Sequence, residues 1–224
     1  MRKPGFCPAL AAALLAGGAL AALAALAGPR AAASPPALPV AAPAAPATAV
    51  PATAASHYTL DPAKSTLEFT FLQAGAKDTG RFPRFTVSLD CAGAVPAGGR
   101  LEVTVDVAAL DTGDKERDET LRSDDLFAVA KFPQAHFLAT RIVKTAGGYE
   151  AEGPLTIRGV TRETKVPFTF REAVEGGAAV GYLAGKTLVR RLDFGVGQGD
   201  WKATDQAGNE VTVSFALRLT RAAH

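Results

Sequence analysis

The sequence predicts an all-β protein in which a single antiparallel eight-stranded barrel carries one or two short helices. Apolar and polar residues alternate with a period of two over most of residues 57–224, which is typical of strands with one buried and one solvated face. Glycine pairs separate several of these runs, as in hairpin turns. Because no long amphipathic helix is available to cover the apolar face, the sheet is expected to close on itself, which also removes its free edges.

The N-terminal 56 residues are not expected to belong to the folded domain. Residues 1–33 are predicted to be a secretory signal peptide, because a basic start precedes an uncharged Ala/Leu run that is followed by Ala-x-Ala patterns at Ala27 and Ala33. An uncleaved anchor is the alternative, since the run is long enough to span a bilayer. Residues 34–56 are almost entirely Ala, Pro, Val and Thr and are predicted to be a disordered tether. We therefore expect an exported, periplasmic protein whose folded domain covers residues 57–224.

Charge and cysteine content exclude several classes of protein. The chain has 24 basic and 22 acidic residues, and three of the basic ones lie in the predicted leader at Arg2, Lys3 and Arg30. No basic tract interleaves with aromatic residues, so nucleic acid is not an expected partner. After removal of the leader, Cys91 is the single cysteine, which precludes an internal disulfide. Its position after an alternating run predicts a structural residue at the end of a strand.

The strands are predicted from the alternating runs in order along the chain. Five segments alternate clearly and three alternate weakly, which gives about eight strands. The glycine pairs of the turns lie at 98–99, 147–148 and 176–177. The clear strands are expected at 67–71, 85–89, 101–107, 166–170 and 211–219, and the weaker ones at 135–143, 148–157 and 179–186.

One charged segment, residues 111–130, interrupts the alternation. Its apolar residues are few, namely Leu121, Leu126, Phe127 and Val129. We expect one or two short helices that lie over an end of the barrel, with the acidic side chains on a solvated face. The spacing of the aspartates does not match an EF-hand loop.

The interior of such a barrel is either filled by its own side chains or encloses one small ligand. Pattern alone leaves both alternatives open. If a channel exists, apolar residues on the inward faces of the strands and in one loop are predicted to line it: Leu67, Phe69, Phe71, Phe85, Val87, Val103, Val105, Phe137, Leu155, Phe168, Phe170, Phe194, Val213 and Phe215.

The sequence contains no recognisable catalytic, metal or cofactor site. His136 is the single histidine well inside the domain, and a metal site needs several converging ligands. Nucleophile-elbow, P-loop, HExxH and CxxC motifs are absent. Glu68 and Glu102 fall on the polar faces of their strands, where they are expected to point to solvent. The glycines of residues 195–199 are interpreted as a tight loop near Trp201 and not as a dinucleotide site. We therefore expect neither an enzyme nor a bound metal or cofactor.

An ordered set of motifs extends over nearly all of residues 58–220. Its central element runs from Asp111-Thr112-Gly113 through a charged stretch that ends at Leu126-Phe127. The other segments are 58–62, 64–69, 131–137, 153–161 (GPLTIRGVT) and 191–197 (RLDFGVG). This ordered set resembles the YceI-like family of bacterial exported proteins.

The resemblance implies a lipocalin-like barrel around an apolar channel that binds polyisoprenoid chains or isoprenoid quinones. It implies no catalytic residues. Polar groups at the channel mouth would then set selectivity, and the candidates are Tyr182, Arg190, Arg191 and Trp201. The function expected is non-catalytic binding, transport or sequestration of a long isoprenoid lipid. The alternative is a filled barrel that acts as the partner of a membrane redox protein of the cytochrome b561 type. A homodimer stays open.

Overall fold

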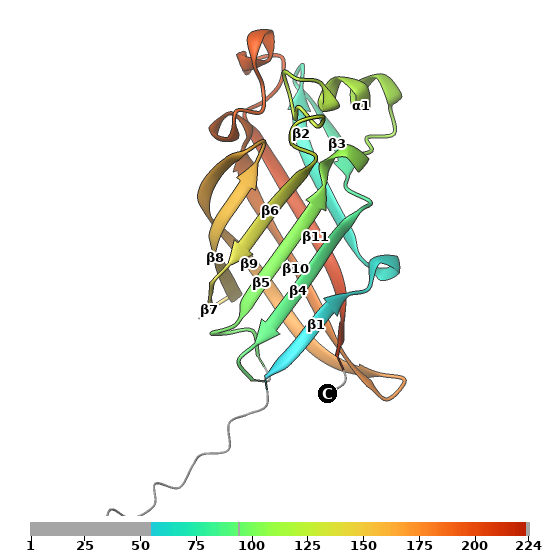
Figure 1. Cartoon of the computed structure of the whole chain (residues 1–224), viewed down its shortest axis with the longest axis vertical. Helices are drawn as coiled ribbons and strands as arrows, with labels where there is room; N and C mark the ends of the chain where they lie inside the picture. The colour runs from blue at the N-terminus through green and yellow to red at the C-terminus, as the bar shows by residue number, and fades with distance from the viewer. Residues whose placement is uncertain (1–54, 94, 223–224) are drawn as a thin grey trace, which may run out of the picture. The chain divides into compact units, whose positions relative to one another are not determined.

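The computed structural model describes residues 55–93 and 95–222, in which eleven strands form one antiparallel sheet. Eight of them close into a barrel, because β1 pairs with β4 on one side and with β11 on the other (Figure 1). The predicted fold class is therefore confirmed. The strands of the barrel, in order around it, are β1 (Ser56–Leu60), β4 (Phe85–Cys91), β5 (Arg100–Asp106), β6 (Gln134–Ala139), β8 (Gly148–Ile157), β9 (Val160–Glu175), β10 (Ala178–Arg190) and β11 (Glu210–Arg221).

The predicted leader, residues 1–33, lies outside the described residues, as does the predicted tether apart from its last two residues. Both remain predictions. Ser56, a residue of the predicted tether, is the first residue of β1 and is buried.

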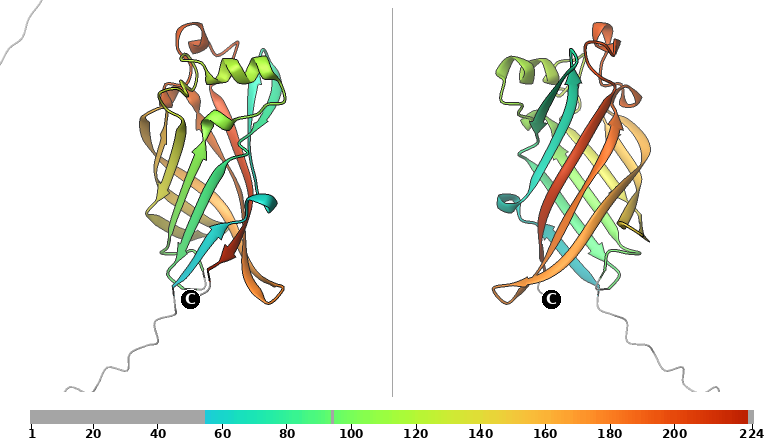
Figure 2. Two further views of the ribbon diagram at one scale, coloured as in Figure 1. Left: turned by 45° about the vertical axis from the view of Figure 1, so that its right-hand side comes forward. Right: turned by 180° about the vertical axis from the view of Figure 1, so that it is seen from behind.

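Three further strands lie outside the closed circle. The long strand β11 pairs with β1 near its C-terminal end and with β2 (Thr66–Gln73) along its middle. The hairpin partner of β2 is β3 (Ala76–Arg81), which a single bridge joins to Asp111. The β2–β3 hairpin therefore replaces β1 in the wall at one end of the barrel (Figure 2). The third strand, β7 (Arg141–Thr145), pairs with β8.

The charged segment forms the expected helix at one end of the barrel. The helix α1 (Lys115–Arg122) begins where the Asp114 carboxylate accepts the backbone N–H of Arg117 at 3.1 Å, as in other capped N-termini. Arg122 holds the helix to the barrel, because its Nε donates to the carbonyl oxygen of Ala108 at 2.9 Å. In the part of the chain that the structure describes, no helix has the length and hydropathy needed to cross a membrane. The described residues also form four short 3-10 helices: η1 (Pro62–Lys64), η2 (Val107–Ala109), η3 (Arg191–Phe194) and η4 (Gly199–Lys202).

A dense apolar core fills the opposite end of the barrel, where β1 begins and β11 ends (Figure 1). Large side chains from β1, β8 and β9 meet there: the rings of Tyr149 and Phe168 stack with centroids 5.6 Å apart, and Tyr58 meets Phe170 edge-on at 5.6 Å. Cys91, the last residue of β4, is 2% exposed in this core, as predicted for a structural residue. Burial raises the pKa of the Cys91 thiol to about 11, since a thiolate in an apolar environment is destabilised.

Candidate ligand-binding site

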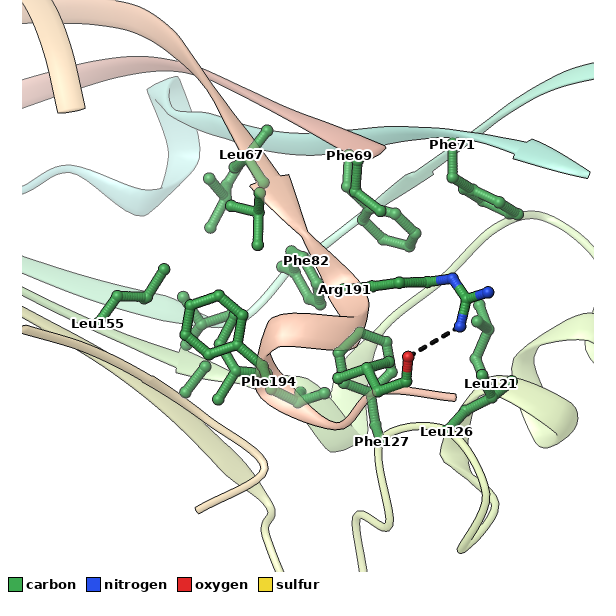
Figure 3. A pocket seen from close by; sticks show the side chains of 18 of the residues that line it. Leu67, Phe69, Phe71, Phe82, Leu121, Leu126, Phe127, Leu155, Arg191 and Phe194 are labelled. Atoms are coloured by element: carbon green, nitrogen blue, oxygen red, sulfur yellow. Dashed lines mark hydrogen bonds between the residues drawn. The ribbon is translucent and has the colours of Figure 1, made fainter. Parts of the chain in front are cut away.

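A cavity of about 490 Å³ occupies the other half of the barrel, beneath α1 and the η3 loop. This volume is typical of sites for small molecules, which span roughly 300–1,000 Å³. Most of its wall is apolar, and the ring of Phe69 lies there beside Phe71 and Phe82, with centroids 5.8 and 4.8 Å away (Figure 3). The interior is therefore filled at one end and hollow at the other.

Ten of the fourteen predicted channel residues line this cavity. They come from strands on all sides of the barrel and from the η3 loop, so the alternation identified the inward faces correctly. These residues are Leu67, Phe69, Phe71, Val103, Val105, Phe137, Leu155, Phe194, Val213 and Phe215.

The other four predicted channel residues do not line the cavity. Val87 and Phe168 belong to the core of the filled end, and Phe85 and Phe170 pack against it. They do face inward, as predicted. Alternation indicates which face of a strand is buried but not how far along the barrel axis a residue lies, so it could not separate the filled half from the hollow half.

Two of the four predicted mouth residues lie at the cavity. Trp201 of η4 and Arg191 of η3 both line it. Arg190 does not: it is exposed on the outer face, with its Nε 4.0 Å from Glu210 Oε1. The reason is again the strand period, because its neighbour Val189 points inward and is 8% exposed.

Tyr182 does not line the cavity either. It lies on β10 near the hairpin at residues 176–177, at the filled end of the barrel, and its neighbour Leu183 occupies the inward position with 1% exposure. The Tyr182 hydroxyl donates to the Glu175 carboxylate on the outer face, and the guanidinium of Arg171 lies 4.5 Å from the centre of its ring. Tyr182 therefore takes part in a surface network and not in the cavity.

Several lining residues were not identified as such from the sequence. Leu121, Leu126 and Phe127 were recognised as apolar residues of the charged segment, and that segment folds over the cavity. Phe82 stands in a short Arg-Phe-Pro-Arg segment without alternation, so no periodic pattern marks it. Ile157, Val189, Val196 and Val211 complete the apolar lining around them, together with Val107, Ala135 and Val166.

The cavity has a polar rim on the side of α1. Gln73, Asp114, Glu116, Arg117 and Thr120 line it there. Arg117 also fixes the helix to the β2–β3 hairpin, because its Nη1 lies 3.2 Å from the Asp78 Oδ1. The rim is therefore the polar part of a lining that is otherwise mostly apolar.

Arg191 differs from the rim because it is 7% exposed. Its guanidinium reaches from η3 into the lining and donates to backbone carbonyls, including that of Val196 at 2.9 Å (Figure 3). Gly197 makes this position accessible: its φ is +115°, and a Cβ there would lie 1.9 Å from Nη1. The glycine at position 197 is therefore needed to leave room for the Arg191 guanidinium, in addition to the tight turn that the sequence predicts for this loop. Burial lowers the pKa of Arg191.

The candidate acid–base residues lie away from the cavity wall. Glu68 is exposed, and Glu102 is 43% exposed with its Oε1 3.1 Å from His136 Nε2. The pKa of Glu102 is lowered, chiefly by the hydrogen bond with His136 and then by Arg100. In residues 55–93 and 95–222, no three His, Cys, Asp or Glu side chains converge as metal ligands would.

Comparison with known proteins agrees with this architecture. The model of the YceI-like domain matches residues 58–219. A UPF0312 protein of Shewanella denitrificans is 32% identical over 148 residues, which is 64% of this chain and 74% of that relative. The crystal structure of BcnA from Burkholderia cenocepacia has a TM-score of 0.65 and 33% identity, over 71% of this chain and 98% of BcnA.

A polyisoprenoid binding domain from Saccharophagus degradans has the same fold, with a TM-score of 0.52 over 74% of this chain and 98% of that domain. Its identity is 18%, so the likeness concerns the fold alone. The family match, in contrast, covers nearly the whole barrel and includes the segments quoted above for the resemblance. The chain belongs to the YceI-like family.

Proposed function

We propose that this protein binds a long isoprenoid lipid in the cavity and transports or sequesters it without catalysis. The observation that carries the proposal is the apolar cavity of about 490 Å³ in one half of the barrel. Family membership and the shared fold with a polyisoprenoid binding domain support the same ligand class. The ligand is a polyisoprenoid or an isoprenoid quinone.

The volume of the cavity determines how many carbons of an isoprenoid lipid it can enclose. If one chain carbon occupies about the volume of a liquid water molecule, roughly 30 Å³, the cavity of about 490 Å³ encloses about 16 carbons, or roughly three isoprene units. A longer chain would extend past the rim beneath α1.

Binding from a membrane would be reversible. Each buried methylene contributes about 0.8 kcal/mol relative to water, but a bilayer offers the same burial. The net free energy from apolar area, relative to the membrane, is therefore near zero. Selectivity then depends on the shape of the cavity and on its few polar groups.

The proposed location is the periplasm, which rests on the predicted leader. The alternative function, a filled barrel that serves a membrane redox protein, required an interior without a continuous cavity, and the cavity is an argument against it. A cytochrome b561-type partner and a homodimer stay predictions.

The test is native mass spectrometry, with organic extraction, on protein purified from the exported fraction without detergent. We expect one isoprenoid lipid per chain. The variant Val105→Glu introduces a carboxylate into the cavity wall, whereas Thr104→Glu makes the same change at the adjacent residue, which faces outward on β5. Because an unpaired charge in an apolar cavity is strongly unfavourable, Val105→Glu should lose the lipid and Thr104→Glu should keep it. An empty wild-type protein that also fails to take up added farnesol would refute the proposal, as would a folded Val105→Glu variant with undiminished lipid.

A further inference from the structure

Arg191 carries a positive charge into the apolar part of the cavity. It is 7% exposed and lines the cavity together with Phe71, Leu121 and Leu126, which surround it in Figure 3. A guanidinium stays protonated even when it is buried, because its pKa is far above neutrality. Its charge is therefore a permanent feature of the site.

Among residues 55–93 and 95–222, the hydrogen-bond partners of Arg191 are all neutral. Its Nε donates to Gly208 O at 2.9 Å and its Nη1 to Val196 O at 2.9 Å. Its Nη2 donates to Ala207 O at 2.7 Å and, more weakly, to Ala203 O at 3.4 Å. These four contacts use four of the five N–H groups that a guanidinium offers. Among the described residues, the second N–H of Nη1 has no acceptor.

Within the described residues the Arg191 guanidinium has no carboxylate partner, because no acidic side chain lies within 4.0 Å of it. Arg218, whose side chain is 12% exposed, provides the contrast, because it pairs with Asp61 at 2.5 Å and with Glu175 at 2.8 Å. A buried charge without an opposite charge is strongly unfavourable. Backbone dipoles offset only part of that penalty, so the site has unused capacity for an anion.

The other charged groups at the cavity are already engaged or lie in the rim near solvent. Arg117 pairs with Asp78, and the Asp114 carboxylate caps α1. His136 also lines the cavity, and its Nε2 is hydrogen-bonded to the Glu102 carboxylate at 3.1 Å. Glu116 is exposed, so its charge is screened by water and salt. The attraction for an anion inside the cavity therefore comes from Arg191.

We propose that Arg191 binds the acidic head group, a carboxylate or a phosphate, of a lipid whose isoprenoid tail occupies the cavity. This inference rests on the function proposed above and names the head group of the same ligand. A carboxylate or phosphate accepts hydrogen bonds from two parallel N–H groups. Arg191 would supply them with the free N–H of Nη1 and the Nη2 N–H that is weakly bonded to Ala203 O. The head group then lies beside Arg191 beneath α1, the first isoprene units of the tail fill the cavity, and the rest of a longer tail leaves past the rim. A neutral prenyl alcohol or quinone would gain less from this site.

The experiment compares four ligands that share the farnesyl tail and differ in head group: farnesoic acid, farnesyl phosphate, farnesol and farnesylamine. Binding to the wild-type protein is measured by isothermal titration calorimetry below the aggregation concentration of each ligand, at low and high salt. We expect the acid and the phosphate to bind at least ten-fold tighter than farnesol and the amine to bind most weakly. The preference should persist at high salt, because the site is buried.

Two variants separate Arg191 from general surface charge. Arg191→Met should reduce the affinity for the two anions to that for farnesol, with farnesol itself nearly unchanged. Arg190→Met removes the adjacent charge, which is exposed on the outer face, and should leave the order of the four ligands intact. If Arg191→Met does not fold, the four-ligand series on the wild-type protein decides alone. Equal affinities for all four ligands would overturn the assignment of Arg191 and leave the proposed function standing, whereas no binding by any of them would refute both.

Discussion

Filling the cavity from its wall is the most direct perturbation that the structure suggests. Val213 lies in the first half of β11, paired with Phe69 on one side and Thr187 on the other, and its side chain faces the cavity. The variant Val213→Trp places an indole in that space. The control is Thr212→Trp, the same substitution at the adjacent residue, which faces outward and pairs with Thr70 and Leu188.

The magnitude of the effect follows from the volume. Tryptophan carries about seven more non-hydrogen atoms than valine, against room for about 16 ligand carbons in a cavity of about 490 Å³. At about 0.8 kcal/mol per buried methylene, displacing about seven carbons removes roughly 5–6 kcal/mol of gross burial. Because a chain can withdraw partly through the mouth, we expect about half of this loss, or roughly a 100-fold weaker Kd.

The assay is calorimetric titration with farnesol, alongside urea unfolding followed by circular dichroism. We expect Val213→Trp to lose affinity while its free energy of unfolding stays within about 1 kcal/mol of the wild type, since the indole enters existing space and does not overpack a core. Thr212→Trp should bind farnesol as the wild type does. Unchanged affinity in a folded Val213→Trp variant would show that the ligand does not occupy this cavity.

Three further predictions concern the filled end and the surface. Phe168→Ala should lower the free energy of unfolding by about 3–5 kcal/mol in urea titrations, because Phe168 is 3% exposed; a loss below about 1 kcal/mol would contradict the dense core described there. The Cys91 thiol, whose pKa burial raises to about 11, should stay protonated at pH 8 and react with Ellman's reagent only after unfolding, so rapid reaction of the native protein would be inconsistent with its burial. The pKa of Glu175 is held below its ordinary value of 4.5, chiefly by the Tyr182 hydroxyl and then by Arg218. Because the ionised form is favoured in the folded state, the ionised Glu175 stabilises the fold above about pH 4.5, and this stabilisation is lost as the pH falls through the lowered pKa. Tm measured from pH 7 to pH 3 should therefore fall less steeply in Glu175→Gln than in the wild type. An identical profile would argue against the hydrogen bonds of Glu175 with Tyr182 and Arg218.

Much of the barrel could be predicted from the sequence because local patterns encode it. Alternation identified the inward faces of the main strands, including Phe69 and Val213, and the glycine pairs marked the hairpins at residues 147–148 and 176–177. The apolar residues of segment 111–130 also indicated a helix over one end.

The strands that sequence analysis missed lack such a pattern. The strand β3 has the sequence AKDTGR and buries only Gly80, so it has no apolar period to detect. The strand β1 is five residues long. The segment 135–143, predicted as one strand, is split at Thr140 into β6 and β7.

The sequence by itself determined the fold class, the inward faces and the family motifs, since each depends on side chains close together along the chain. Only the tertiary structure decided which half of the barrel is hollow. Phe69 and Phe168 have the same type and nearly the same exposure, 4% and 3%, yet one lines the cavity and the other belongs to the core of the filled end. Phe69 lies on β2, which replaces β1 in the wall at the hollow end, whereas Phe168 lies on β9 and packs in the core of the filled end. Which side chains then meet across the interior is set by contacts between residues far apart in the chain, and no local period encodes it.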